Sequence, residues 1–477
     1  MSARALRRAF RPGAAALVGA ALLAVPPALD RGAGPTAGGH SLAPHVTPSA
    51  PAGAAPAASP TDQVDVSRTA DAQAEVAVAA DPAHPEVLLA GSNSFAPSAR
   101  VYGSVDGGAT WTSDPLPVPK GTCGYGDPAL AIAAGGRQFY AYLTGPCASS
   151  PRPDVSLALA TRPGPDAQWT PARLHVPGAM AVNDKEAIAI DVSPSSPHFG
   201  RLYLAWSRFY RPSNSFEVVV AHSDDSGATW STAVRVTGVG GVPQTYASLA
   251  IGADGTLYIA WLTLDQHVRL DHSTDGGDHF GRDLTVDSAP FAAGWCSFAG
   301  ASIPAQAQRC VTATPLVTWD PVHGRVYVTY SGSGQTGREK NVYVSAFDAK
   351  SLQPLVARRQ VNPPDGAYPS DQFLPASAVD ASTGQLWVCW YDTSGDRTRK
   401  RARYTCASSG DGAGTWSPLQ RAASVYSNET SSRATSFQYG DYAGIAVAGG
   451  VAHPIWTDSR DLAALGEEIY TTALTSP

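Results

Sequence analysis

A short phrase of eight residues recurs four times along the chain and restricts its fold more than any other feature. Two copies, at 104–111 and 223–230, follow the pattern Ser-x-Asp-x-Gly-x-Thr-Trp. A third, at 273–280, ends in Phe, and a fourth, at 409–416, has Ala in place of the Gly. Ser and Asp side chains can bond the backbone N–H groups of a tight turn, and Gly can adopt a positive φ. The phrase therefore predicts repeated turns between neighbouring β-strands.

A second repeat lies between these turns. Each copy has a short apolar strand, a turn containing Gly, Pro or Asp, and a strand rich in aromatic residues. Seven copies can be read, at 75–93, 127–144, 186–207, 248–263, 315–331, 375–392 and 443–458. Large apolar residues alternate with small ones, which is typical of half-buried and buried strands. The pattern predicts an all-β protein, a seven-bladed β-propeller with four-stranded blades. A six-bladed ring with one degenerate repeat is the alternative.

The two ends of this repetitive region complement each other. The last copy supplies three strands, the third of them at 468–473, and then the chain ends. Residues 62–68 have the length and character of the missing fourth strand. Pairing between the N- and C-terminal strands would close the ring and remove exposed sheet edges, which favour aggregation. Residues 62–477 are therefore predicted to form one propeller domain.

The residues before this domain differ in composition. Residues 1–30 place four Arg ahead of an apolar stretch at 14–25, which is the pattern of an export signal and too short for a membrane-spanning helix. Residues 31–61 are rich in Ala, Pro and Gly and predict a disordered linker. No other stretch is apolar enough to cross a membrane, so we expect a secreted, extracellular protein.

The cysteines and the charge agree with that location. Six cysteines, an even number, fit an oxidising compartment. The predicted disulfides join neighbours in the sequence: Cys123–Cys147, Cys296–Cys310 and Cys389–Cys406. Metal binding by these cysteines is the alternative, although no C-x-x-C motif or histidine cluster accompanies them. The formal net charge is −6 with no basic tract, so nucleic acid is not an expected partner and we expect a monomer.

Strand direction sorts the loops of such a propeller into two faces. The repeated turns fall on one face, and the loops that enter the first strand or leave the second strand of each blade fall on the other. This second face gathers carboxylates, phenols and guanidinium groups around a funnel, the usual place for a ligand. The candidate catalytic residues there are Asp127, Glu186, Asp371, Tyr439 and Asp441. The alternative is that these acids cap turns and balance neighbouring arginines.

The repeated phrase resembles the Asp-box of sialidase-like β-propellers. The resemblance implies a propeller that acts on carbohydrate, with three Arg holding a sugar carboxylate and a Tyr, assisted by a Glu, attacking the sugar. An Asp then serves as the acid and base. The candidates for these roles are Arg208, Arg338 and Arg460 for the clamp, Tyr439 for the nucleophile, Glu186 for its helper and Asp127 for the acid. Sialidases carry Arg-Ile-Pro ahead of the first inner strand, where this chain has Arg68-Thr69-Ala70.

Other functions stay open beside that of a sialidase. Acids outnumber arginines around the funnel, which favours hydrolysis of a neutral polysaccharide by two carboxylates. A propeller that binds a glycan or a protein without reaction is the other alternative, because the fold hosts many functions. The ring of carboxylates also has the oxygen ligands for a structural calcium ion. No other cofactor or metal is expected.

Overall fold

The computed structural model describes residues 63–95, 99–147, 155–174, 182–210, 215–236, 242–288, 290–291, 300–365, 368–431, 433–463 and 465–477. The predicted export signal and linker, residues 1–61, lie outside these ranges. All regular elements within the ranges are β-strands. No helix long and apolar enough to span a membrane occurs in the described part of the chain.

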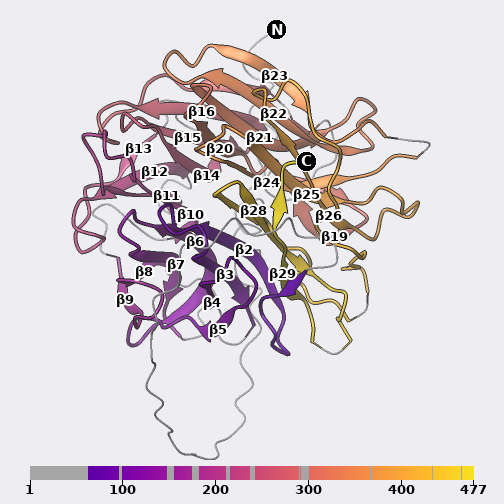
Figure 1. The fold of residues 1–477 in the computed structure, drawn as a ribbon, viewed down its shortest axis with the longest axis horizontal. Coiled ribbons are helices and arrows are strands. Elements are labelled where there is room, and N and C mark those ends of the chain that lie inside the picture. Colours follow the sequence, from indigo (N-terminus) through magenta and orange to yellow (C-terminus); the bar gives the residue numbers. More distant parts are fainter. Residues whose placement is uncertain are drawn as a thin grey trace, which may run out of the picture.

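Seven antiparallel sheets follow one another along the chain and form the blades of a ring (Figure 1). Blade 1 contains β2 (Gln73–Ala80), β3 (Leu88–Ser94), β4 (Ala99–Ser104) and β5 (Thr112–Pro115). Blade 2 contains β6 (Cys123–Ile132), β7 (Gln138–Gly145), β8 (Ser156–Arg162) and β9 (Thr170–Arg173). Blade 3 contains β10 (Val182–Ile190), β11 (Leu202–Tyr210), β12 (Ser215–Ser223) and β13 (Val234–Arg235). Blade 4 contains β14 (Gln244–Ile251), β15 (Leu257–Thr263), β16 (His267–Ser273) and β17 (Leu284–Ser288).

A two-stranded hairpin separates blade 4 from the last three blades. It consists of β18 (Ala301–Ile303) and β19 (Gln306–Val311). Blade 5 contains β20 (Leu316–Asp320), β21 (Arg325–Ser333), β22 (Lys340–Asp348) and β23 (Pro354–Gln360). Blade 6 contains β24 (Gln372–Val379), β25 (Leu386–Asp392) and β26 (Arg403–Ser409). Blade 7 contains β27 (Gly444–Ala448), β28 (Val451–Asp458), β29 (Glu468–Thr471), β30 (Leu474–Thr475) and the N-terminal β1 (Val64–Asp65).

The seventh blade joins the two ends of the propeller. Strand β1 pairs antiparallel with β29, with Val64 opposite Thr471 and Asp65 opposite Tyr470. Figure 1 shows the indigo N-terminal strand beside the yellow C-terminal strands. The prediction of seven blades closed by terminal pairing is therefore confirmed, and the six-bladed alternative is wrong.

The repeated phrases form turns with the same hydrogen bonds each time. In the first copy, between β4 and β5, the Ser104 hydroxyl donates to Asp106 at 2.8 Å and accepts from the Gly108 N–H at 2.9 Å. Asp106 also accepts from the backbone N–H of Thr110 at 2.9 Å. The copies at 223–230, 273–280 and 409–416 repeat these three bonds within 0.1 Å. Each turn is thus built from residues at most four positions apart.

Large aromatic side chains fill the space between blades. Trp206, Trp261, Trp390 and Trp456, from the second strands of blades 3, 4, 6 and 7, are fully buried or nearly so. Trp206 packs with Phe139 and other residues of blade 2, which joins two adjacent blades in one apolar cluster. Burying such large side chains is the main source of stability in a fold whose blades share few backbone hydrogen bonds.

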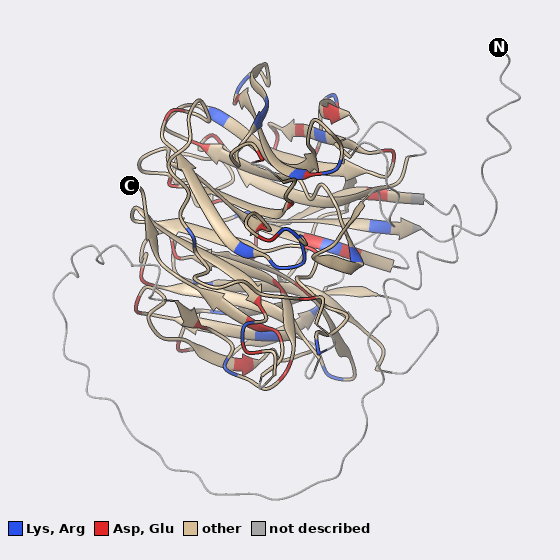
Figure 2. Ribbon diagram, turned by 90° about the vertical axis from the view of Figure 1, so that its right-hand side faces the viewer, with Lys and Arg blue, Asp and Glu red and all other residues tan. Residues whose placement is uncertain are grey.

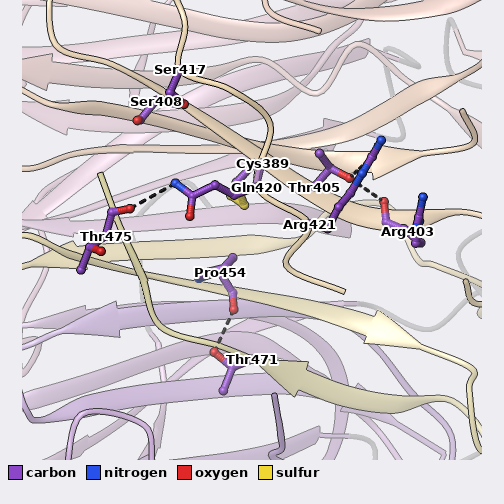
Figure 3. Close-up of a disulfide and its surroundings, with 11 residues drawn as sticks. Cys389, Arg403, Thr405, Ser408, Ser417, Gln420, Arg421, Pro454, Thr471 and Thr475 are labelled. Carbon is purple, nitrogen blue, oxygen red and sulfur yellow. Dashed lines mark hydrogen bonds between the residues drawn. A yellow bond between two sulfur atoms is a disulfide. The ribbon is translucent and has the colours of Figure 1, made fainter. Parts of the chain in front are cut away.

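Two of the predicted disulfides lie in the described residues. Cys123 is bonded to Cys147, and Cys389 is bonded to Cys406. Cys389 on β25 lies directly opposite Cys406 on the paired strand β26. Cys310 is also disulfide-bonded, while Cys296, its predicted partner, lies outside the described residues. Figure 3 shows the surroundings of Cys389, where Gln420 Nε2 donates to the Thr475 carbonyl at 3.1 Å and links blade 6 to the C-terminal strand. Disulfides fit an extracellular protein.

Candidate functional site

The innermost strands begin with an unusual backbone conformation. Six blades carry a residue other than glycine with a positive φ where the first strand begins: Glu75, Asp127, Lys185, Tyr246, Thr314 and Leu374. In five of these blades the pairing with the second strand shifts at the same point, which marks a β-bulge. A left-handed residue costs about 1–2 kcal/mol outside glycine, so such positions persist where the surrounding structure holds them. Here the conformation brings polar side chains together at the axis.

Five charged side chains form what we call the axial cluster: Glu75, Asp127, Lys185, Arg309 and Asp441. Lys185 Nζ lies 3.0 Å from Asp127 Oδ2 and 2.9 Å from Asp441 Oδ2. Arg309 lies 2.6 Å from Glu75 Oε1 and 2.9 Å from Asp441 Oδ1. Residues from blades 1, 2 and 3, the hairpin and the loop before blade 7 are thereby linked across the axis.

Uncharged side chains support the axial cluster. Asn93, on β3, donates from Nδ2 to Glu75 and, at 3.4 Å, to Asp127 Oδ1. Its carbonyl oxygen accepts the backbone N–H of Asp127 at 2.6 Å, which orients the amide. The Lys185 ammonium lies 5.6 Å from the centre of the Tyr246 ring and 5.5 Å from that of Tyr442, within the range of cation–π attraction. One amide therefore holds two acids side by side, and two aromatic rings enclose the lysine.

The hairpin β18–β19 brings Arg309 to the axis. Gln306 Nε2 donates to the Gly440 carbonyl at 3.0 Å, and the Gln308 N–H donates to Gln438 Oε1 at 3.0 Å. These bonds fasten the hairpin, which precedes blade 5, to the loop that enters blade 7. Arg309 then bridges Glu75 and Asp441. The hairpin thus completes the axial cluster.

Burial and the two cations shift the pKa values of the acids in the axial cluster in opposite directions. Burial raises the pKa of Glu75 to about 8, although Arg309 and Lys185 act in the opposite direction. Burial also opposes ionisation of Asp441, but Arg309 and Lys185 outweigh it and hold the pKa at about 2. The pKa of Asp127 is lowered as well, since Lys185 overcomes the effect of burial. Two cations thus compensate two ionised carboxylates, while burial favours the protonated form of Glu75.

A central cavity of about 290 Å³ adjoins the axial cluster. Asp127, Lys185, Glu186, Tyr246 and Tyr442 contribute its polar lining, and small or apolar residues of the inner strands contribute the rest. Neither carboxylate oxygen of Glu186 has a hydrogen-bond partner in the described residues, and burial raises its pKa well above the ordinary value. A second acid whose protonated form is favoured by burial therefore lines this space.

Three of the predicted catalytic residues lie together in this arrangement. Asp127 and Asp441 both bind Lys185, and Glu186 follows Lys185 on β10. Asp371 lies apart in blade 6, fully buried, where Arg399 Nε donates to it at 2.8 Å. Tyr439 is also fully buried, and its hydroxyl bonds Ser427 at 3.0 and 3.1 Å.

The predicted arginine clamp is spread over three blades. Arg208 binds Glu217 at 2.7 Å within blade 3, and Arg460 binds Asp458 at 2.6 Å in blade 7. Arg338 is exposed in a loop of blade 5. Among the described contacts, the cations that reach the axial acids are Lys185 and Arg309, which the sequence-based prediction missed. Figure 2 shows Lys and Arg positions interspersed with Asp and Glu positions around the ring.

A sequence signal for Lys185 existed in the repeat itself. Glu75, Asp127, Lys185 and Tyr246 each stand two residues before an Ala or Ser of the first strand, so they occupy equivalent positions. Aligning the copies on that small residue would have identified the lysine. Arg309 had no such signal, because the hairpin has no counterpart in the other blades.

Cations of the protein occupy the space between the axial carboxylates. Lys185 and Arg309 take the positions that a metal ion would take between Glu75, Asp127 and Asp441. Within the described ranges, no group of three or more His, Cys, Asp or Glu side chains is placed to hold a metal ion. Calcium binding stays an untested prediction.

Comparisons with known proteins concern the fold. No protein-family model and no curated protein matches the sequence. A protein of unknown function from Dyadobacter fermentans is 12% identical, with a TM-score of 0.49 over 87% of this chain and 98% of its own. An alpha-L-arabinanase from Penicillium chrysogenum is 14% identical, with a TM-score of 0.45 over 73% of this chain and 92% of its own. An intramolecular trans-sialidase from Ruminococcus gnavus is 11% identical, with a TM-score of 0.44 over 66% and 89%.

Proposed function

We propose that this chain is a secreted propeller that hydrolyses glycosidic bonds at the axial cluster. The observation that carries the proposal is the pair formed by Glu75 and Asp127. Both accept from Asn93 Nδ2, so they are neighbours, yet the pKa of Glu75 is raised to about 8 and that of Asp127 is lowered. Neighbouring titratable groups with separated pKa values are the arrangement that acid–base catalysis uses.

The two carboxyl groups suit the two roles of a glycosidase. Glu75 would donate its proton to the glycosidic oxygen as the C–O bond breaks. Asp127 would attack the anomeric carbon itself before water releases the sugar, because two carboxyl groups bonded to the same Asn93 Nδ2 lie too close together for the water-mediated, inverting route. This double displacement retains the configuration at the anomeric carbon, so the stereochemistry of the product tests it. Arg309, with a quarter of its side chain exposed, is the member of the cluster most open to a substrate hydroxyl.

The charge of the axial cluster favours a neutral substrate. Asp127 and Asp441 balance Lys185 and Arg309, so no cation is left over to bind a sugar carboxylate. The arginines predicted for that purpose lie on separate blades in the structure. We therefore favour a neutral glycan over a sialoside.

A non-catalytic function, binding of a glycan or protein, is the second candidate. The observation that favours it is the hairpin β18–β19. Gln306 and Gln308 bind it to the loop that enters blade 7, and Arg309 already engages two of the acids. Binding at the rim of the funnel would need no access to Glu75.

Assaying the purified full chain on a panel of neutral chromogenic glycosides and sialosides tests the proposal. We expect turnover of a neutral glycoside that Asp127→Asn abolishes. Asp371→Asn is the matched control, because it removes a buried carboxylate that belongs to a separate ion pair with Arg399. Absence of turnover on every glycoside, together with saturable glycan binding, would favour the binding function.

A further inference from the structure

The outer turn of blade 2 departs from the repeated turn found in blades 1, 3, 4 and 6. Residues 162–169 follow β8 and end in Trp169, with the same spacing that separates Ser104 from Trp111. Arg162 and Gly164 stand where the repeated phrase has its Ser and Asp. The hydroxyl and carboxylate that close the other turns are therefore missing in blade 2.

A cleft of about 450 Å³ opens beside this altered turn. It lies between the outer strands of blade 1 and the turn of blade 2, and none of its lining residues belongs to the axial cluster. Its polar lining comes from Thr112, Asp114, Arg162, Asp166, Gln168 and Trp169. Gly103 forms part of the wall, where a Cβ atom would lie 3.5 Å from the Arg162 guanidinium. The volume is in the range of small-ligand sites.

Several donor atoms around the cleft have no hydrogen-bond partner among the described residues. Arg162 donates from Nε to Gln138 at 2.7 Å and stacks over the Trp169 ring at 4.5 Å, and its two terminal nitrogens have no hydrogen-bond partner among the described residues. The Trp169 N–H is likewise unpartnered there, whereas the corresponding N–H of Trp111 donates to Gly108 at 3.0 Å.

Two carboxylates complement these donors. Asp114 and Asp166 form no ion pair with Arg162 in the described residues, although both raise its pKa against the larger, lowering effect of burial. The three charges therefore surround the cleft without neutralising one another by contact. Donors, acceptors and an indole ring around one space are what a sugar needs, because its hydroxyls both donate and accept and its C–H face is apolar.

We propose that the cleft between blades 1 and 2 is a second binding site, which takes a short neutral oligosaccharide. Arg162 and the Trp169 N–H would donate to sugar hydroxyls, and Asp114 and Asp166 would accept from them. The two carboxylates outnumber the single guanidinium, which disfavours anionic sugars. The site is independent of hydrolysis at the axis.

Calorimetric titration of the full chain with neutral di- to hexasaccharides of arabinose, xylose, glucose and galactose tests this site. We expect saturable binding to one series, weakened about 10- to 100-fold by Arg162→Ala, since a hydrogen bond to a charged group contributes about that much. Gly103→Val should also weaken binding, because its side chain would fill the cleft. The matched control is Arg173→Ala, an exposed arginine on β9 of the same blade that does not line the cleft.

The same titration on Asp127→Asn separates the cleft from the axial cluster. Binding that persists in Asp127→Asn and is lost in Arg162→Ala supports the second site, whether or not the chain hydrolyses glycosides. Binding that is lost in Asp127→Asn and unchanged in Arg162→Ala and Gly103→Val overturns it. Failure of all the neutral oligosaccharides to bind also overturns it.

Discussion

The two faces of the propeller use aspartate in different ways. In the repeated turns, Asp106 and Asp225 accept hydrogen bonds from residues two and four positions away. At the axis, Asp127 contacts Asn93 and Lys185, which lie 34 and 58 positions away. The pKa of Asp225 is held at about 2 by its own turn, whereas the pKa values of the axial acids depend on several blades. A carboxylate bonded by its own loop depends on the local sequence alone, while an axial carboxylate depends on the assembly of several blades.

The largest expected effect is on the rate of hydrolysis. Glu75→Gln should lower kcat by about 10²- to 10⁴-fold, because the amide cannot protonate a leaving oxygen. Asp225→Asn, on the opposite face, should leave kcat within about twofold. Steady-state kinetics on the best glycoside from the panel measure both. Equal losses in the two variants would remove the distinction between the faces.

Removing the central cation should cost stability. Lys185→Met leaves Asp127 and Asp441 buried without one of their compensating charges, and breaking a buried ion pair costs about 3–5 kcal/mol. Chemical denaturation measures the free energy of unfolding, with Lys350→Met, on an exposed turn of blade 5, as the control. A loss below about 1 kcal/mol would show that the axial cluster does not hold the blades together.

The pH dependence of the two faces should differ in sign. The folded pKa of Glu75, about 8, exceeds its ordinary value of 4.5, so the native state holds a proton that the unfolded chain lacks between these values. Its contribution to stability is fully present below pH 4.5 and is lost as the pH rises to about 8, where kcat should also fall. Glu75→Gln should make the stability profile less steep in that window, where Asp184 and Glu468, with pKa values raised to about 7 and about 8, still titrate. An unchanged profile would place the raised pKa on another group.

The pKa of Asp225 moves in the opposite direction. Its folded pKa of about 2 lies below the ordinary value of 3.8, so its contribution to stability is present above pH 3.8 and is lost as the pH falls through about 2. Comparing the wild type with Asp225→Asn across this acid range, by thermal unfolding, separates the turn from the axis. A difference that appears only near pH 8 would contradict the assignment.

The smallest effect should come from a single repeated turn. Asp225→Ala removes the acceptor of the Thr229 N–H and hydroxyl, at 2.8 and 2.5 Å, in an exposed loop. We expect a loss of about 1 kcal/mol in the free energy of unfolding, the usual value for such bonds. Activity should not change. Val105→Ala, at an exposed position of the first repeated turn outside the repeated bonds, serves as the comparison.

Much of the fold could be predicted because its determinants are local and repeated. The turn bonds join residues within one phrase, and Cys389 and Cys406 face each other across one hairpin. The pairing of β1 with β29 followed from counting strands. The last repeat lacks a fourth strand, and the first residues of the domain could supply it. The candidate site was only partly predictable. Asp127, Glu186 and Asp441 were identified as polar residues that enter inner strands, but Tyr439 and Asp371 share that position and are buried elsewhere.

The sequence by itself determined the number of blades, their turns and the closure of the ring, because each of these depends on contacts that recur with a fixed spacing. Only the tertiary structure decided which charges meet at the axis. Arg309 reaches Glu75 over a separation of 234 residues, from a hairpin that no repeat predicts. The bulge that turns Lys185 toward two aspartates likewise depends on blades that assemble around it. Electrostatic interactions act through space, so no spacing along the chain specifies them.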